Sequence, residues 1–85
     1  MTKYKEKMVR KYVIATLDNN TQYLRSLHWG KYTFSDIEGC SKFNSSKLAN
    51  EMINYYRSDT NDLETLLVVV PVEITYEIIN EIEQE

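Results

Sequence analysis

Two side chains of this 85-residue sequence could form a nucleophile and its base: the single cysteine, Cys40, and the single histidine, His28. A thiol acts as a nucleophile when a neighbouring base takes its proton and a third group orients that base. Nothing in the sequence places these two residues together or supplies the third group. One cysteine and two glycines also cannot build a cysteine metal cage or a glycine-rich phosphate loop. We therefore expect no catalytic residues, no metal site, no cofactor and no enzymatic activity.

Basic and aromatic residues are interleaved in the first part of the chain, a composition that can serve nucleic-acid binding. Aromatic side chains on a sheet can stack on bases while lysines contact phosphates. The sequence pI of about 5.1 argues against this function unless the acids lie on the opposite side of the molecule. A small nucleic-acid-binding accessory protein is therefore our alternative function. Its candidate contacts are Lys5, Lys7, Lys11, Arg25, Trp29 and Lys31.

Charge is divided unevenly along the chain. Residues 1–57 hold all ten Lys and Arg with five acids, a net charge of +5, whereas residues 58–85 hold eight acids and no Lys or Arg, a net charge of −8. Such an acidic segment could steer a basic partner protein and present carboxylates where that partner expects phosphates, or it could be solvated surface. The candidate partner-binding residues are Asp59, Asp62, Glu64, Glu73, Glu77 and Glu81.

The elements that must position these residues follow from local patterns. Residues 9–17 are rich in β-branched side chains and end in turn formers, which predicts a strand and a hairpin loop. Residues 22–29 and 31–34 predict two short strands that meet at Gly30, so that the first three strands form an antiparallel meander. Apolar residues then recur at spacings of three and four, which predicts a helix over residues 45–57. Its expected N-cap is Asn44.

The last apolar segment predicts a strand with one face committed to the core. Its even positions from Leu66 to Ile78 are all apolar. A single helix covers one face of a sheet, so the apolar odd positions need a second layer, supplied by another protomer or a partner. Proline cannot donate to a strand ladder, which indicates an edge strand or a bulge. The predicted homodimer interface consists of Leu67, Val69 and Pro71.

Length and composition predict a single domain over residues 1–85. The chain is 42% hydrophobic and 27% charged, as expected for a globular α+β domain of β-β-β-α-β order with one antiparallel sheet. We expect a flexible basic arm over residues 1–8 and an acidic tail over residues 80–85. The longest apolar stretch, Leu66 to Val72, is too short to cross a membrane, and no signal peptide is expected. A lone thiol favours the cytoplasm.

Three segments resemble small phage and prophage proteins of low-GC Gram-positive bacteria: Lys11-Tyr12-Val13-Ile14, Tyr23-Leu24, and Ser41 to Ala49 with its K-F-x-S-x-x-x-A helix start. The resemblance covers residues 10–78 and carries no site residues. Genes of this kind include anti-CRISPR and other anti-defence inhibitors. We therefore expect a non-enzymatic protein-binding module in the bacterial cytoplasm, a phage-encoded inhibitor of a host defence or nucleic-acid-handling protein.

Overall fold

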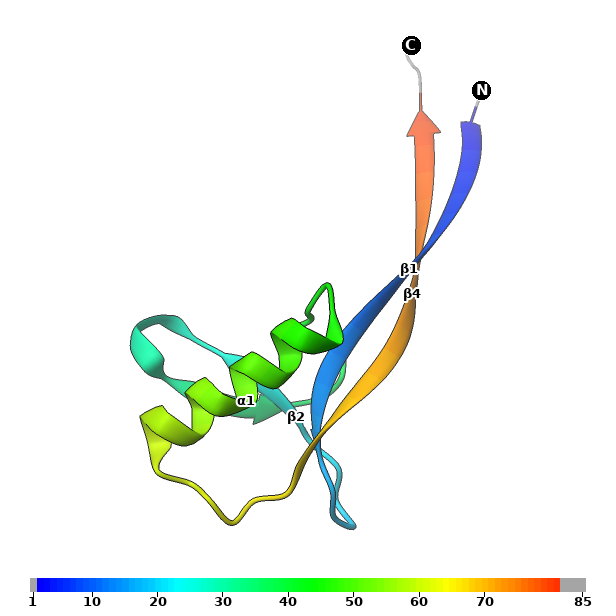
Figure 1. Ribbon diagram of the computed structural model, residues 1–85. Helices are drawn as coiled ribbons and strands as arrows, with labels where there is room; N and C mark the ends of the chain where they lie inside the picture. The colour runs from blue at the N-terminus through cyan, green and yellow to red at the C-terminus, as the bar shows by residue number, and fades with distance from the viewer. Residues whose placement is uncertain (1, 82–85) are drawn as a thin grey trace.

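The computed structural model describes the backbone of residues 2–81 and the side chains of residues 7–76, and it forms a four-stranded antiparallel sheet with one helix (Figure 1). The strand order in the sheet is β3-β2-β1-β4, so β4 lies at an edge. The predicted α+β class and the β-β-β-α-β order are confirmed. The elements are β1 (Thr2–Thr16), β2 (Tyr23–Ser26), a 3-10 turn η1 (His28–Gly30), β3 (Tyr32–Ser35), α1 (Ser46–Thr60) and β4 (Leu67–Glu81).

The long strands β1 and β4 pair along their whole length, from Thr2↔Glu81 to Thr16↔Leu67. Residues 2–8 of the expected flexible arm and residues 80–81 of the expected tail therefore belong to the sheet. Residues 82–85 lie outside the part of the chain that the structure describes. By contrast, β1 and β2 share a single residue pair, Ala15↔Tyr23, before they diverge. The loop after β3 then takes over this side of β1.

This loop replaces β2 as the neighbour of β1 at Phe43. The Phe43 N–H donates to the Tyr12 carbonyl (2.8 Å), and the Tyr12 N–H donates to the Phe43 carbonyl (2.9 Å). Both backbone groups of Tyr12 therefore point away from β4. Because Tyr12 is opposite Pro71, the proline nitrogen lies on the outer side of β4, where its missing N–H costs no ladder hydrogen bond. The predicted edge strand is confirmed.

Helix α1 begins one residue later than predicted. Its N-cap is Ser45, whose side chain accepts a hydrogen bond from the Leu48 N–H (3.2 Å), so the expected Asn44 cap is wrong. The Asn44 side chain instead accepts a hydrogen bond from Lys11. At the other end, Asn61 adopts a left-handed conformation (φ 59°) that closes the helix.

The core lies between α1 and one face of the sheet. Ile14, Leu24, Ala49 and Tyr56 form its buried centre. The odd-numbered β4 residues Leu67 and Val69 pack against this centre, together with the side chains of Tyr12, Tyr32, Phe34, Phe43, Met52 and Ile53. The sequence pattern assigned the helix to the even-numbered face of the last strand, and that assignment is wrong.

The outer halves of β1 and β4 leave the body as a two-stranded ribbon, which we call the projecting ribbon (described side chains 7–11 and 72–76; Figure 1). The radius of gyration is 16.6 Å, whereas a compact domain of this length has about 12 Å. The molecule measures 56 × 26 × 24 Å. An isolated two-stranded ribbon is only marginally stable in water, so this element is suited to being covered by something else.

Candidate functional site

The face of the projecting ribbon opposite the helix side carries lysines on one strand and apolar residues on the other. Residues that pair across two strands share a face, and the pairs here are Lys11↔Val72, Val9↔Ile74 and Lys7↔Tyr76. We call these six residues the open face. The side chains of Val9, Val72 and Ile74 are half-buried, and Tyr76 is 48% exposed. Aliphatic and cationic groups thus lie side by side on an accessible surface.

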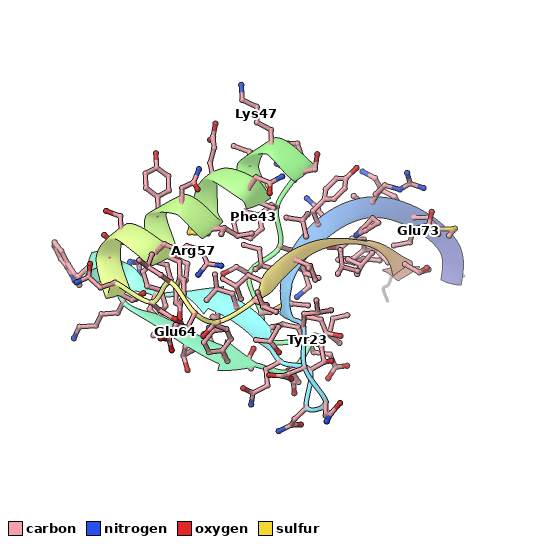
Figure 2. The ribbon with its side chains drawn as sticks, turned by 60° about the horizontal axis from the view of Figure 1, so that its bottom comes forward. Tyr23, Phe43, Lys47, Arg57, Glu64 and Glu73 are labelled. Carbon is pink, nitrogen blue, oxygen red and sulfur yellow. The ribbon has the colours of Figure 1, made fainter. Side chains whose placement is uncertain are left out.

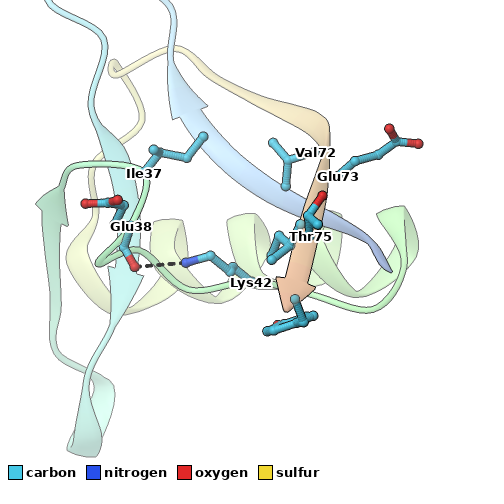
Figure 3. Close-up of a pocket in the computed structure, with 8 residues that line it drawn as sticks. Ile37, Glu38, Lys42, Val72, Glu73 and Thr75 are labelled. Carbon is cyan, nitrogen blue, oxygen red and sulfur yellow. Dashed lines mark hydrogen bonds between the residues drawn. The ribbon is translucent and has the colours of Figure 1, made fainter. Parts of the chain in front are cut away.

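An open groove of about 560 Å³ runs along the β4 side of this face (Figure 3). Its other wall is the loop after β3, which contributes Ile37, Glu38 and Lys42. The Lys42 ammonium donates to the carbonyls of Glu38 (3.0 Å) and Cys40 (3.2 Å), which fixes its position at the groove. The groove therefore combines apolar side chains with residues of both charges, because Glu38 and Glu73 line it together with Lys42.

The two faces of the projecting ribbon differ in charge. Lys7 and Lys11 lie on the open face. Arg10 and Glu73 are paired across the two strands and lie on the other face. Their side chains form an exposed ion pair with a nitrogen–oxygen distance of 3.6 Å. An exposed pair of this kind contributes about 0–1 kcal/mol. Lys5 has the same strand parity as Lys7, but its side chain lies outside the described part of the chain.

The six acids predicted as partner-binding residues lie in separate regions. Figure 2 shows Glu64, in the loop after α1, well apart from Glu73 on β4. Near the end of α1, Asp59 accepts a hydrogen bond from the Tyr32 hydroxyl (2.5 Å). Burial and this hydrogen bond raise the pKa of Tyr32 to about 12. Glu77 and Glu81 belong to β4, but their side chains are not among the described ones. A role of these acids in binding stays a prediction.

Asp62 already has a structural role. Its carboxylate accepts hydrogen bonds from the hydroxyls of Thr65 and Tyr56 (2.6 Å each) and from the N–H groups of Glu64 and Thr65 (3.1 Å each). These bonds, the one from the Thr65 hydroxyl first, hold the pKa of Asp62 well below its usual range. The carboxylate thereby ties the start of the loop 61–66 to the helix.

This network predicts a loss of stability in acid. A carboxyl whose pKa is depressed by folding stabilises the protein above its unfolded value, about 3.9, and that contribution is lost as the pH falls further. We expect the free energy of unfolding of the wild type to fall more steeply from pH 7 to pH 3 than that of Asp62→Asn. Urea unfolding at both pH values measures this. Glu64→Gln, which removes a carboxylate from the same loop, should retain the wild-type slope, and equal slopes for all three would contradict the prediction.

The residues predicted for nucleic-acid contact are divided between two places. Lys7 and Lys11 lie on the projecting ribbon, whereas Arg25, Trp29 and Lys31 belong to the β2–β3 hairpin at the other end of the molecule (Figure 1). Trp29 is 94% exposed in a left-handed conformation (φ 65°). The structure therefore does not gather these residues into one interface.

The thiol and the imidazole lie in different environments. Cys40 is buried, its sulfur donates to the Ile37 carbonyl (3.2 Å), and burial raises the pKa of the thiol. His28 is exposed in η1. Among the described residues there is no cluster of three or more metal-ligating side chains. Within residues 2–81, no helix has both the length and the apolar character to span a membrane.

Sequence reasoning missed the groove and the place of Lys42 in it. The signal that could have revealed the groove was the row of even-numbered apolar residues in β4. One short helix covers only one face of the sheet. The sequence pattern assigned this row to the core under the helix, and the row therefore was not considered as an accessible surface. Ile37 and Glu38 gave no signal, because a loop's path over a sheet is not encoded in periodicity. The groove has to be interpreted from this chain alone, since no protein-family model, curated protein or solved structure matches it.

Proposed function

We propose that this chain is a non-enzymatic protein-binding module whose binding surface is the open face of the projecting ribbon. The observation that carries the proposal is the open groove beside Val72, Ile74 and Tyr76, on an element that extends away from the body. Exposed apolar surface that is concave and rimmed by charge is typical of interaction sites. A tyrosine at its end supplies a rigid anchor of the sort enriched at interfaces.

Covering this face supplies the second layer that the ribbon lacks. Burial of apolar surface contributes about 25 cal/mol per Å², and part of this gain offsets the cost of association. The side chains of Val72 and Ile74 are partly packed already, so little side-chain freedom remains to be lost. A partner that binds here therefore gains apolar contact at a low ordering cost.

For the partner we propose a bacterial host protein in the host cytoplasm. The resemblance to phage accessory proteins supports a target in host defence or nucleic-acid handling. The acids of β4 supply a further proposed contact, with Glu73 on the face opposite the lysines. A basic target could meet this second face while the open face supplies apolar contact.

Capture of partners by the tagged chain from a nuclease-treated lysate of a low-GC Gram-positive bacterium tests the proposal. We expect Ile74→Glu to reduce the recovered partner by at least about tenfold, because it places a charge within the apolar contact. The matched control is Leu63→Glu, since Leu63 is an apolar residue of the loop after α1 and is 76% exposed. Equal recovery with wild type and Ile74→Glu would refute binding through this face.

Nucleic-acid binding remains the second candidate because of one observation: Glu73 lies on the face of the ribbon opposite Lys7 and Lys11. The carboxylate of Glu73 then need not repel a polyanion bound to the lysines. Recovery of a partner only when nuclease is omitted would favour this function. Binding that weakens steeply with salt and with Lys11→Glu would support it further.

A further inference from the structure

The edge of β1 that faces away from β4 is free along the projecting ribbon. Strand β2 pairs with β1 on this side only at Ala15, and the loop after β3 does so only at Tyr12. Both backbone groups of Tyr12 point to this side, and the direction of these groups alternates along a strand. The N–H and carbonyl groups of Arg10 and Met8 therefore point the same way. Within residues 2–81 they have no backbone partner.

The two free edges of the ribbon differ in their capacity to take another strand. At the β4 edge the row of donors is interrupted at Pro71. The β1 edge carries no proline between Thr2 and Thr16, and Met8 at its middle is 65% exposed. A two-stranded ribbon is only marginally stable in water, and further strands stabilise it. The β1 edge is therefore the place where an added strand would stabilise the ribbon.

The sequence of this edge is complementary to itself. Two antiparallel copies of β1 that meet with Met8 opposite Met8 bring Glu6 of each copy opposite Arg10 of the other. Opposite charges at paired positions of neighbouring strands stabilise a sheet, and like charges destabilise it. Two-fold symmetry makes the favourable pair occur twice. Because Arg10 also contacts Glu73 within its own copy, its guanidinium would lie between two carboxylates.

Neighbouring registers of the same two strands are less favourable. A register centred on Lys7 places this lysine opposite its own copy, with like charges in contact. A register centred on Val9 brings Glu6 opposite Tyr12, whose N–H and carbonyl already bond Phe43. Registers centred between two residues oppose groups that point to this edge to groups that face β4, so no ladder forms.

From this edge and this register we infer that two copies of the chain form a two-fold symmetric dimer through antiparallel pairing of their β1 strands, centred on Met8. The two ribbons become one four-stranded sheet. Such a contact closes after two copies, and Pro71 hinders further addition at the outer edges. This interface replaces the one predicted at Leu67 and Val69, which pack under the helix. The inference goes beyond the proposed function and does not depend on it, because both open faces stay accessible.

The dimer ladder is short. It ends at the Glu6–Arg10 pairs, because the loop after β3 occupies the edge at Tyr12. Beyond these pairs Lys5 comes opposite Lys11, whose ammonium has its own hydrogen-bond partner in Asn44. Interfaces of small area are weak, so we expect a Kd of about 10–100 µM.

Sedimentation equilibrium over about 5–500 µM protein tests the inference. The wild-type mass should rise with concentration from 10.1 kDa toward twice that value. Met8→Pro removes an outward N–H without breaking the ladder to β4, and it should weaken the dimer at least about tenfold. The matched control is Thr75→Pro, because Thr75 pairs with Met8 and its N–H points to the opposite edge of the ribbon. It should leave the dimer unchanged.

Two charge variants test the register without changing the backbone. Glu6→Arg and Arg10→Glu each place like charges opposite one another in a dimer of identical copies, so each should weaken association at least about tenfold. A mixture of the two variants restores both opposite-charge pairs between unlike copies, and it should regain the wild-type Kd to within about threefold. The contact of position 10 with Glu73 lies within one copy and affects monomer and dimer alike.

A mass of 10.1 kDa at every concentration would overturn the inference. So would a dimer that Met8→Pro leaves intact, a dimer that Thr75→Pro dissociates equally, or a mixture of the charge variants that is no more dimeric than either variant alone. Masses that grow beyond two copies would replace the closed dimer with open-ended assembly. Circular dichroism checks that each variant is folded. If Met8→Pro unfolds the chain, the charge variants and their mixture decide the question.

Discussion

Truncation of Tyr56 to alanine is expected to lower the free energy of unfolding by about 3–5 kcal/mol, the usual cost of removing a buried aromatic side chain. Tyr56 is 5% exposed and forms edge-to-face contacts with Tyr32 (centroids 5.2 Å apart) and Phe34 (6.0 Å). Its hydroxyl donates to Asp62 (2.6 Å). A domain of this size has a total stability of about 5 kcal/mol, so urea titration should find this variant largely unfolded.

Two companion variants separate the contribution of the Tyr56 hydroxyl from that of its buried ring. Tyr56→Phe keeps the ring and loses the hydrogen bond to Asp62, so it should cost about 1 kcal/mol. Tyr55→Ala removes a neighbouring ring that is 60% exposed and should change stability by less than about 0.5 kcal/mol. Similar losses for Tyr55→Ala and Tyr56→Ala would show that the core does not lie on the helix side described above.

Hydrogen exchange is expected to differ by at least about a thousandfold between the two halves of β1. Val13 and Val9 both lie in the ladder with β4, opposite Val70 and Ile74. Val13 is fully buried in the body, whereas Val9 belongs to the projecting ribbon. Exchange at Val13 requires global unfolding, while exchange at Val9 requires only local opening of two strands. Exchange followed residue by residue by NMR measures both rates.

The Tyr56→Phe variant checks this interpretation. A small loss of global stability should accelerate exchange at Val13 and leave the rate at Val9 unchanged, because local opening does not break the contact to Asp62. Similar rates at Val13 and Val9 in the wild type would mean that the ribbon unfolds only together with the core. The ribbon would then already be stable without a second layer, and the physical argument for a covering partner would lose its basis.

The order of the elements could be predicted from the sequence because each rests on a local signal. The β-branched run before Leu17 marks a strand, and the spacing of Leu48, Ala49 and Met52 marks a helix. The choice between Asn44 and Ser45 as N-cap could not be made, because both side chains can cap and Asn44 is taken by Lys11, a residue distant in sequence. Such a contact exists only after the chain has folded.

The candidate site could be predicted only in part for a similar reason. Alternation in β4 divides Leu67 and Val69 from Val68 and Val70, but it does not say which set the helix covers. The choice depends on the path of the chain from β3 into α1. In the same way, Arg25 and Lys7 are separated because β2 leaves β1 after one residue pair, and no pattern within either strand encodes that divergence.

The proline at the edge of β4 also governs how safely the chain can present so long a strand. An exposed edge is a template for fibril growth, because a neighbouring molecule can add its own strand to the free donors and acceptors. At Pro71 this row lacks a donor, and at Glu73 it carries a charge. Both features act as gatekeepers against aggregation. The protein can thus expose a projecting ribbon while discouraging its own polymerisation along that edge.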